Sequence, residues 1–223
     1  MTPNDVIEQV LRLEQDSGLL RTPDAHIQQV LLGFVNQTIL STAGFRPDLF
    51  AKLGDISTTA GNVVQSMPGD SLRLIEIFHV KGGNSVVEVS HSMMERSYPG
   101  WASETPGMPV NYMRHPRNHN RYFLYPAPEE GVVLVADYAQ TPGTYGMDDT
   151  IEHLADAYLP ALVHGTAAMA ANVLNDYIQP ERAEAHRAAY ERILGVSLQA
   201  KMGLDSDERR EPEDDRRRRP RNE

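Results

Sequence analysis

Residues 72–89 read LRLIEIFHVKGGNSVVEV, and this stretch decides the fold class. Its first half, residues 72–80, is rich in β-branched and aromatic side chains, which predicts a strand. Lys81-Gly82-Gly83-Asn84 then supplies turn residues, and the valines that follow predict a return strand and hence a β-hairpin. Segments with helical spacing lie on both sides, so the sequence predicts a helical protein that is interrupted by strands.

Two helices are expected before the strands. The first covers residues 4–16, with Asn4 as its N-cap and Gly18 as its stop. Its apolar stripe consists of Val6, Ile7, Val10, Leu11 and Leu13. The second helix covers residues 23–41, because Thr22-Pro23-Asp24 offers a cap and a proline at the first helical position.

A small antiparallel β module is expected over residues ~70–140. The preceding segment, residues 45–69, loses its periodicity and is predicted to be extended chain with turns. Residues 92–100 can hold a short helix or a turn. Further strands are predicted at residues 110–113, 121–125 and 132–138, with the link at residues 126–131 joining the last two as a hairpin.

Helical spacing returns in the last third of the chain. Asp156 is the predicted cap of a long helix that reaches Asp176, with Pro160 tolerated near the first turn. Pro180 opens a last helix that runs to Lys201. Residues 205–223 hold eight acids and seven arginines in blocks, a composition that buries too little apolar surface to fold alone.

These elements predict the α+β class: a helical bundle of about four helices with an inserted small antiparallel β module and an extended polar C-terminal tail. We expect four parts: residues 1–66 (N-terminal helices and extended linker), 67–146 (inserted antiparallel β module), 147–203 (C-terminal helices) and 204–223 (charged tail for partner docking).

Composition excludes several classes of protein. The formal net charge of −10 disfavours non-specific DNA binding, because an acidic body repels phosphates at long range. The absence of cysteine excludes disulfides and thiolate metal sites. The first residues do not resemble a secretory signal, and no stretch approaches the ~20 apolar residues of a membrane span, so we expect a cytosol-like environment without a membrane partner.

Candidate reacting groups are few. His115 and His119 are four residues apart, a spacing that suits a metal on a helix, but Pro116 favours a polar loop. Ser90-His91-Ser92 lacks the sequence context of a nucleophile, and Gly82-Gly83 lacks the lysine of a phosphate loop. We therefore expect no catalytic residues, no metal ligands and no cofactor.

The arginine run near the C-terminus and the aromatic residues of the β module each allow a functional and a purely structural interpretation. The arginine run at residues 216–221 suits phosphates and carboxylates alike, and the acids before it favour docking on a protein over nucleic-acid contact. The aromatic residues of the β module are expected to pack in its core instead of stacking on bases. They are Trp101, Tyr112, Tyr122, Phe123 and Tyr125.

The order of elements and four phrases resemble the head-to-tail adaptor (connector) family of tailed phages, especially short-tailed ones. The phrases are MPGDSLRL (67–74), YPGW (98–101), RYFLYPAP (121–128) and ADAYLPALV (155–163). The resemblance covers most of residues 1–201. It implies a structural virion protein that is made in the infected bacterial cytoplasm and sits at the head-tail junction.

The resemblance also implies a set of partners. Copies of the chain form a ring, typically of twelve, that joins the portal protein to a tail or nozzle protein and lines a channel through which genomic DNA passes without specific binding. Subunit packing is assigned to the small residues Gly165, Ala167, Ala168 and Ala171, because they permit close backbone approach. Portal docking is assigned to Arg209, Arg210, Arg216, Arg217, Arg218, Arg219 and Arg221.

Three alternatives stay open at this point. The chain can be another structural part of a phage, such as a tail-completion or nozzle-associated protein. It can be a nucleic-acid-binding protein that acts through Arg216–Arg219, or a small hydrolase or metal enzyme that uses His115, His119 or Ser92.

Overall fold

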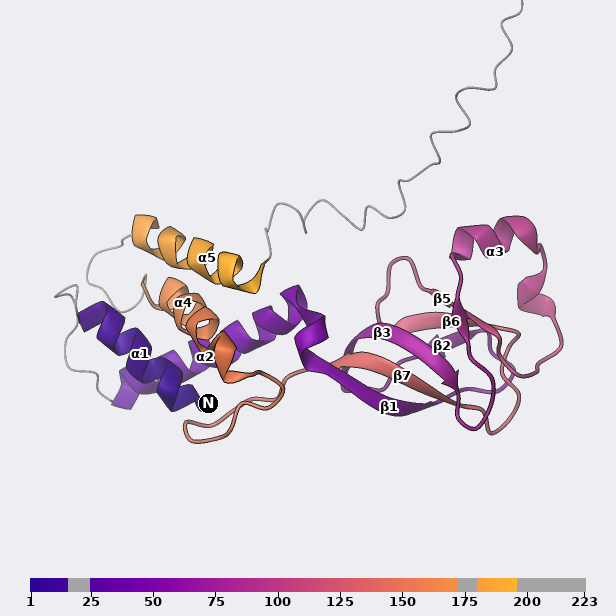
Figure 1. The fold of residues 1–223 in the computed structure, drawn as a ribbon, viewed down its shortest axis with the longest axis horizontal. Helices are drawn as coiled ribbons and strands as arrows, with labels where there is room; N and C mark the ends of the chain where they lie inside the picture. Colours follow the sequence, from indigo (N-terminus) through magenta and orange to yellow (C-terminus); the bar gives the residue numbers. More distant parts are fainter. Residues whose placement is uncertain (16–24, 172–179, 196–223) are drawn as a thin grey trace, which may run out of the picture.

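The N- and C-terminal helices and the sheets occupy opposite ends of the molecule, and the short helix in the insert lies with the sheets (Figure 1). A computed structural model describes residues 1–15, 25–171 and 180–195. The helices from both ends of the sequence gather at one end of the structure, and all strands lie at the other (Figure 1). This arrangement confirms the predicted α+β class with a β part inserted between helices.

The N-terminal helices are α1 (Pro3–Gln15) and α2 (Ala25–Phe45). The prediction that Asn4 caps the first helix was wrong. The hydroxyl of Thr2 accepts a hydrogen bond from the Asp5 backbone N–H at 3.2 Å, and the Asp5 carboxylate accepts one from the Thr2 N–H at 2.7 Å. This reciprocal pair is a capping box, and it places Pro3 in the first turn.

Helix α2 runs four residues past its predicted end at residue 41. It ends at Phe45, and Pro47 then begins the short 3₁₀ helix η1 (Pro47–Phe50) that leads into the sheets. The predicted stop at Gly18 and the predicted cap at Thr22-Pro23-Asp24 lie outside the described residues.

The C-terminal helices are α4 (Leu159–Ala170), preceded by the 3₁₀ helix η3 (Asp156–Tyr158), and α5 (Pro180–Leu194). Asp156 does not cap α4, which corrects the prediction: its carboxylate accepts a hydrogen bond from the N-terminal amine of Met1 at 3.0 Å. Pro160 lies in the first turn of α4, as expected.

Helix α5 ends seven residues before the predicted Lys201. Gly195 follows it in the left-handed region with φ +65°, a conformation that glycine adopts without strain and that ends helices. The predicted extension of α4 to Asp176 falls in residues 172–179, outside the described part of the chain.

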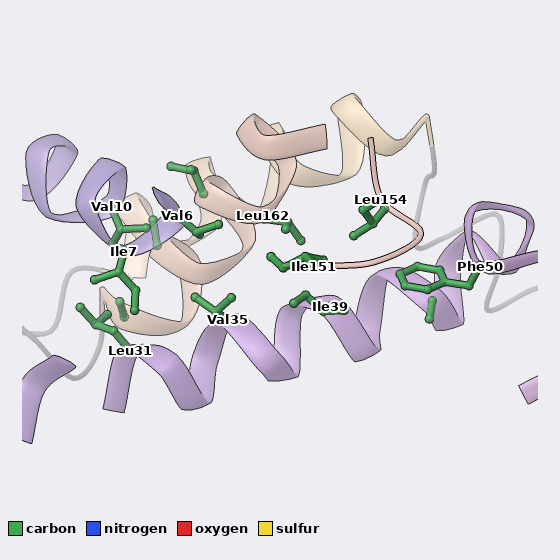
Figure 2. Close-up of a cluster of buried hydrophobic side chains, with 14 residues drawn as sticks. Val6, Ile7, Val10, Leu31, Val35, Ile39, Phe50, Ile151, Leu154 and Leu162 are labelled. Carbon is green, nitrogen blue, oxygen red and sulfur yellow. The ribbon is translucent and has the colours of Figure 1, made fainter. Parts of the chain in front are cut away.

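The helices from both ends of the sequence share one core. Side chains of α1, α2, η1, α4 and the segment before η3 meet in a single apolar cluster (Figure 2). Burying each such side chain contributes roughly 1.5–3 kcal/mol, so this cluster holds the two ends of the chain together. Its labelled members are Val6, Ile7, Val10, Leu31, Val35, Ile39, Phe50, Ile151, Leu154 and Leu162.

The strands form two sheets that enclose a second core. The first sheet has the order β1 (Ala51–Ser57), β7 (Val133–Gln140), β3 (Ser71–Val80), and all its pairs are antiparallel. The second has the order β2 (Val64–Ser66), β6 (Arg121–Tyr125), β5 (Asn111–Arg114), β4 (Val87–Glu88), and its β4–β5 pair is parallel. The large side chains between the sheets include Ile77, Tyr112, Tyr122, Leu124 and Leu134.

The first predicted hairpin forms only next to its turn, and the second was wrong in its pairing. After the turn at residues 81–84, only the bridge between His79 and Ser85 continues beside β3, and the chain then crosses to the other sheet. Strand β3 pairs with β7 instead, and β4 pairs with β5. The link at residues 126–131 likewise leads from β6 in one sheet to β7 in the other, so it is a crossing between the sheets.

Two strands lie in the segment that we expected to be linker. Strand β1 is largely exposed and includes Lys52, Gly54 and Asp55, so it has little of the apolar alternation that predicts a strand. Residues 91–97 form a helix, α3 (His91–Ser97), which decides between the two predicted forms of this segment. It ends before the short 3₁₀ helix η2 (Trp101–Ser103).

Candidate docking surfaces

Of the two histidines considered as metal ligands, His115 has side-chain contacts that stabilise its loop. The Nδ1 atom of His115 accepts hydrogen bonds from the backbone N–H groups of Arg117 at 3.2 Å and Asn118 at 3.0 Å. Its ring stacks on Phe123 with the centroids 5.5 Å apart. Among the residues that the structure describes, no three potential ligands of the His, Cys, Asp or Glu type come together in one group.

The other candidate reacting groups are not arranged for catalysis. The hydroxyls of Ser90 and Ser92 hydrogen-bond each other at 2.8 Å, while Nε2 of His91 faces the carboxylate of Glu95 at 3.6 Å. A nucleophile needs its base within hydrogen-bond reach, and this geometry directs the imidazole elsewhere. Gly82 has φ +72° in the turn after β3, which is the turn role we expected.

The aromatic residues of the β part are packed, as predicted. Trp101, Tyr112 and Tyr122 are buried. Phe123 and Tyr125 are half-buried and pack against the small cluster around Trp101 and Met113. The three buried rings are not accessible as a platform on which single-stranded nucleic acids could stack.

The small residues of α4 contact other helices of the same chain. A methyl group added to Gly165 would lie 2.5 Å from Cγ2 of Thr38 and 3.0 Å from Cδ2 of Tyr190, so α2 and α5 approach this position closely. Ala167 and Ala171 are buried, and Ala168 is partly exposed. The assignment of these residues to contacts between subunits stays a prediction, for which Ala168 is the best placed of the four.

An open groove runs beside these small residues. Its volume is about 550 Å³, and it lies between α2, α4 and α5. Phe45 and Tyr190 meet edge to face at 6.3 Å along it, and Glu184 and Arg187 form an ion pair at its rim. The lining residues are Thr38, Ser41, Phe45, Gly165, Ala168, Met169, Pro180, Ala183, Glu184, Arg187, Tyr190 and Glu191.

A histidine pair joins α4 to α5. The Nδ1 atoms of His164 and His186 are 2.9 Å apart, so one ring donates and the other accepts. Burial, together with His164 and Arg182, lowers the pKa of His186 below its ordinary value. The residues are 22 positions apart in sequence and belong to different helices, so no local spacing pointed to the pair.

Arg114 links the two sheets and was not singled out from the sequence. Its guanidinium donates to Glu88 on β4 at 2.7 Å and to the backbone carbonyl of Leu74 on β3 at 2.9 Å. The hydroxyl of Tyr112 donates to the same carboxylate at 2.8 Å. Arg114 holds the pKa of Glu88 below its ordinary value, and burial raises the pKa of Tyr112 to about 12.

The arginines assigned to portal docking, at positions 209, 210, 216–219 and 221, lie outside the described residues. Within the described part of the chain, no helix is both long enough and apolar enough to cross a bilayer.

The described residues thus combine a shared helical core, a β insert and an open groove beside α4. The chain belongs to the SU10 adaptor protein family, whose family model matches residues 1–220. This is a phage head-tail adaptor family, so the resemblance found in the sequence is confirmed and the chain is a structural adaptor protein of a phage. No curated protein matches the chain.

Membership of this family implies a general role and a location for the protein. Its members are structural adaptors, which are typically not enzymes, and the family implies a place at the head-tail junction of the virion. It also implies interaction with portal and tail proteins.

Proposed function

We propose that copies of this chain form a ring of twelve that joins the portal to the tail and surrounds the channel for the genome. The observation that carries the proposal is the open groove beside α4 in a chain of the adaptor family. A ring requires two different faces of one subunit to fit each other. The groove supplies one such face.

The groove suits a neighbouring subunit because small residues form its floor. Ala168 and Ala183 are partly exposed there, so a side chain of a neighbouring subunit can pack against α4 and α5 at this position. Leu40 is 49% exposed on another face of α2, and we assign it to the groove of the neighbour. Apolar surface that is left open on a monomer is then buried in the ring.

The other partners are assigned to the remaining parts of the chain. We propose that the inserted β module, residues 67–146 with strands β1 and β2 added, faces the tail or nozzle protein. The arginines of residues 204–223 dock on the portal, since guanidinium groups pair with carboxylates in two-point contacts. The helical parts, residues 1–66 without strands β1 and β2 and residues 147–203, form the body of the ring.

The genome passes through the ring without specific contacts in this proposal. A formal net charge of −10 per chain gives the assembly an acidic field, which disfavours adhesion of DNA phosphates.

Electron microscopy of the chain co-expressed with its portal protein tests the proposal. We expect a closed ring bound to the portal, and we expect Ala168→Trp to abolish the ring, because the bulky side chain fills the groove. Ala102→Trp, at an exposed position of η2 in the β part, is the matched control and should leave the ring intact. A chain that stays monomeric and never binds the portal would contradict the proposal.

A further inference from the structure

The hairpin formed by β5 and β6 is a basic region in an acidic protein. Residues 105–128 contain no acidic residue, although the whole chain has a formal net charge of −10. The basic residues of this segment are Arg114, His115, Arg117, His119 and Arg121. They occupy the ends of the two strands and the connecting loop, so the topology places them together.

A small cavity lies where this hairpin meets β3. Its volume is about 20 Å³, which is room for one or two oxygen atoms. Five of its six lining residues are basic, and none is acidic. They are Arg73, Leu74, Arg114, His115, His119 and Arg121.

Internal hydrogen bonds hold the loop around the cavity in one shape. His115 accepts from two backbone N–H groups, as described above, and the carbonyl of Asn118 accepts from the Arg121 N–H at 3.0 Å. The side-chain oxygen of Asn118 also accepts from the Asn120 N–H at 3.0 Å. The basic side chains are therefore carried on a preorganised backbone, which lowers the entropy lost on binding.

Within residues 1–15, 25–171 and 180–195, Arg114 is the one lining arginine whose side chain bonds to partners in the chain. Arg114 is bonded to Glu88 and to backbone carbonyls. Across the described residues, neither Arg73 nor Arg121 forms an ion pair, and both line a cavity that has no acidic residue in its lining. Two arginines that are free of ion pairs at one cavity favour the binding of an anionic group there.

We propose that this cavity and its rim bind a carboxylate from an acidic segment of a partner protein. The cavity has room for the oxygens of a planar carboxylate. Arginine forks match the planar carboxylate group in two-point pairs. Tyr122 is buried, and the ring of Phe123 already lies against the rings of His91 and His115, which disfavours stacking of nucleic-acid bases on them.

The proposed carboxylate site is a separate binding function, and it does not depend on the formation of the ring. A protein that forms no ring can still bind a carboxylate here, and a ring can form without this site. Failure of one proposal therefore leaves the other standing.

Fluorescence anisotropy with the full-length chain tests the site. The probes are a labelled decaglutamate peptide and a labelled DNA duplex, in about 0.1 M salt, where the acidic groups more than about 10 Å away are screened. We expect the peptide to bind and the double variant Arg73→Gln/Arg121→Gln to lose about tenfold or more in affinity, since two charged contacts are removed. Both side chains lack an ion pair within the described residues, so the melting temperature of the variant should stay close to that of the wild type.

The control variant Arg12→Gln/Arg192→Gln removes the same formal charge from exposed positions of α1 and α5. This control variant should change the affinity for the decaglutamate peptide by less than about twofold, because the removed charges act on the cavity only at long range. An equal loss in both variants, or no binding of the peptide to the wild type, would overturn the proposal. Tighter binding of DNA than of the peptide, lost in the double variant, would overturn it in favour of a phosphate site.

Discussion

Two buried tyrosines in adjacent strands differ in whether their hydroxyls are satisfied. Tyr112 on β5 donates its hydroxyl to Glu88, and Tyr122 on β6 is fully buried with a hydroxyl that has no hydrogen-bond partner among the described residues. A buried polar group without a partner costs about 1–3 kcal/mol, whereas a made hydrogen bond to a carboxylate stabilises the fold.

Tyr122→Phe should therefore raise the free energy of unfolding, by about 1 kcal/mol, because it removes an unsatisfied hydroxyl and keeps the ring. Tyr112→Phe is the matched control and should lower it by about 1–2 kcal/mol, since Glu88 loses a donor. Urea unfolding measures both changes. A loss of stability in Tyr122→Phe as large as in Tyr112→Phe would show that the Tyr122 hydroxyl has a partner.

Gly165 lies close to side chains of α2 and α5, and this packing can be tested by substitution. Gly165→Ala should destabilise the chain by about 1–3 kcal/mol, because the new methyl group lies 2.5 Å from Thr38 Cγ2 and forces the helices apart. Gly33→Ala, in an exposed and open position of α2, should stabilise it by about 0.5–1 kcal/mol through helix propensity alone. Thermal unfolding of the two variants gives the comparison. Equal shifts in the two melting temperatures would contradict the packing account.

Single residues were the hardest features to predict from sequence. Asn4 and Thr2 are both good caps by residue type, and only the reciprocal bond with Asp5 decides between them. Arg114 gave no local signal, because its partners on β3 and β4 are 26 to 40 residues away in sequence. The basic cavity was missed for the same reason, since Arg73 reaches it from another strand.

At the scale of elements, the contact between α4 and α5 responds to pH. Burial, His164 and Arg182 lower the pKa of His186, so the folded chain binds a proton less readily than the unfolded chain does. Above the ordinary histidine pKa of about 6.5, neither state binds this proton and the folded chain has its full stability. As the pH falls below that value, the unfolded chain binds the proton more readily, so the free energy of unfolding decreases. Acid therefore weakens the packing of α5 on α4.

Urea unfolding at a series of pH values checks this behaviour. The wild type should lose stability below pH about 6.5, and His186→Gln should lose less over the same range. His26→Gln, at an exposed position of α2, should follow the wild type. A pH profile of His186→Gln identical to that of the wild type would show that the loss arises elsewhere in the chain.

Helices were predicted better than strand pairing, and the reason is physical. Helical hydrogen bonds are local, so the apolar spacing of α1, α2, α4 and α5 was sufficient to place them within several residues. Strand partners are chosen across long sequence separations: β3 had a turn and a valine run directly after it, yet it pairs with β7. The turn signal was correct, while the return strand joined the other sheet.

At the scale of the whole molecule, the order of elements was the strongest information in the sequence. Both ends of the chain contribute to one helical core, and the β part is carried between them. This architecture and the adaptor family were predictable without coordinates, because they depend on sequential order and on phrases spread over most of the chain. Subunit number and contacts were not predictable, since they depend on surfaces of other molecules.

We propose above that this chain forms the ring between portal and tail. Cryo-electron microscopy of the intact virion, with the chain located in the density, tests it most directly. We predict a rotationally symmetric ring directly below the portal, with the helical body in contact between neighbours at the groove beside α4 and the β part directed toward the tail. Density in which the portal meets the tail without this chain, or in which the chain lies elsewhere in the particle, would contradict the claim.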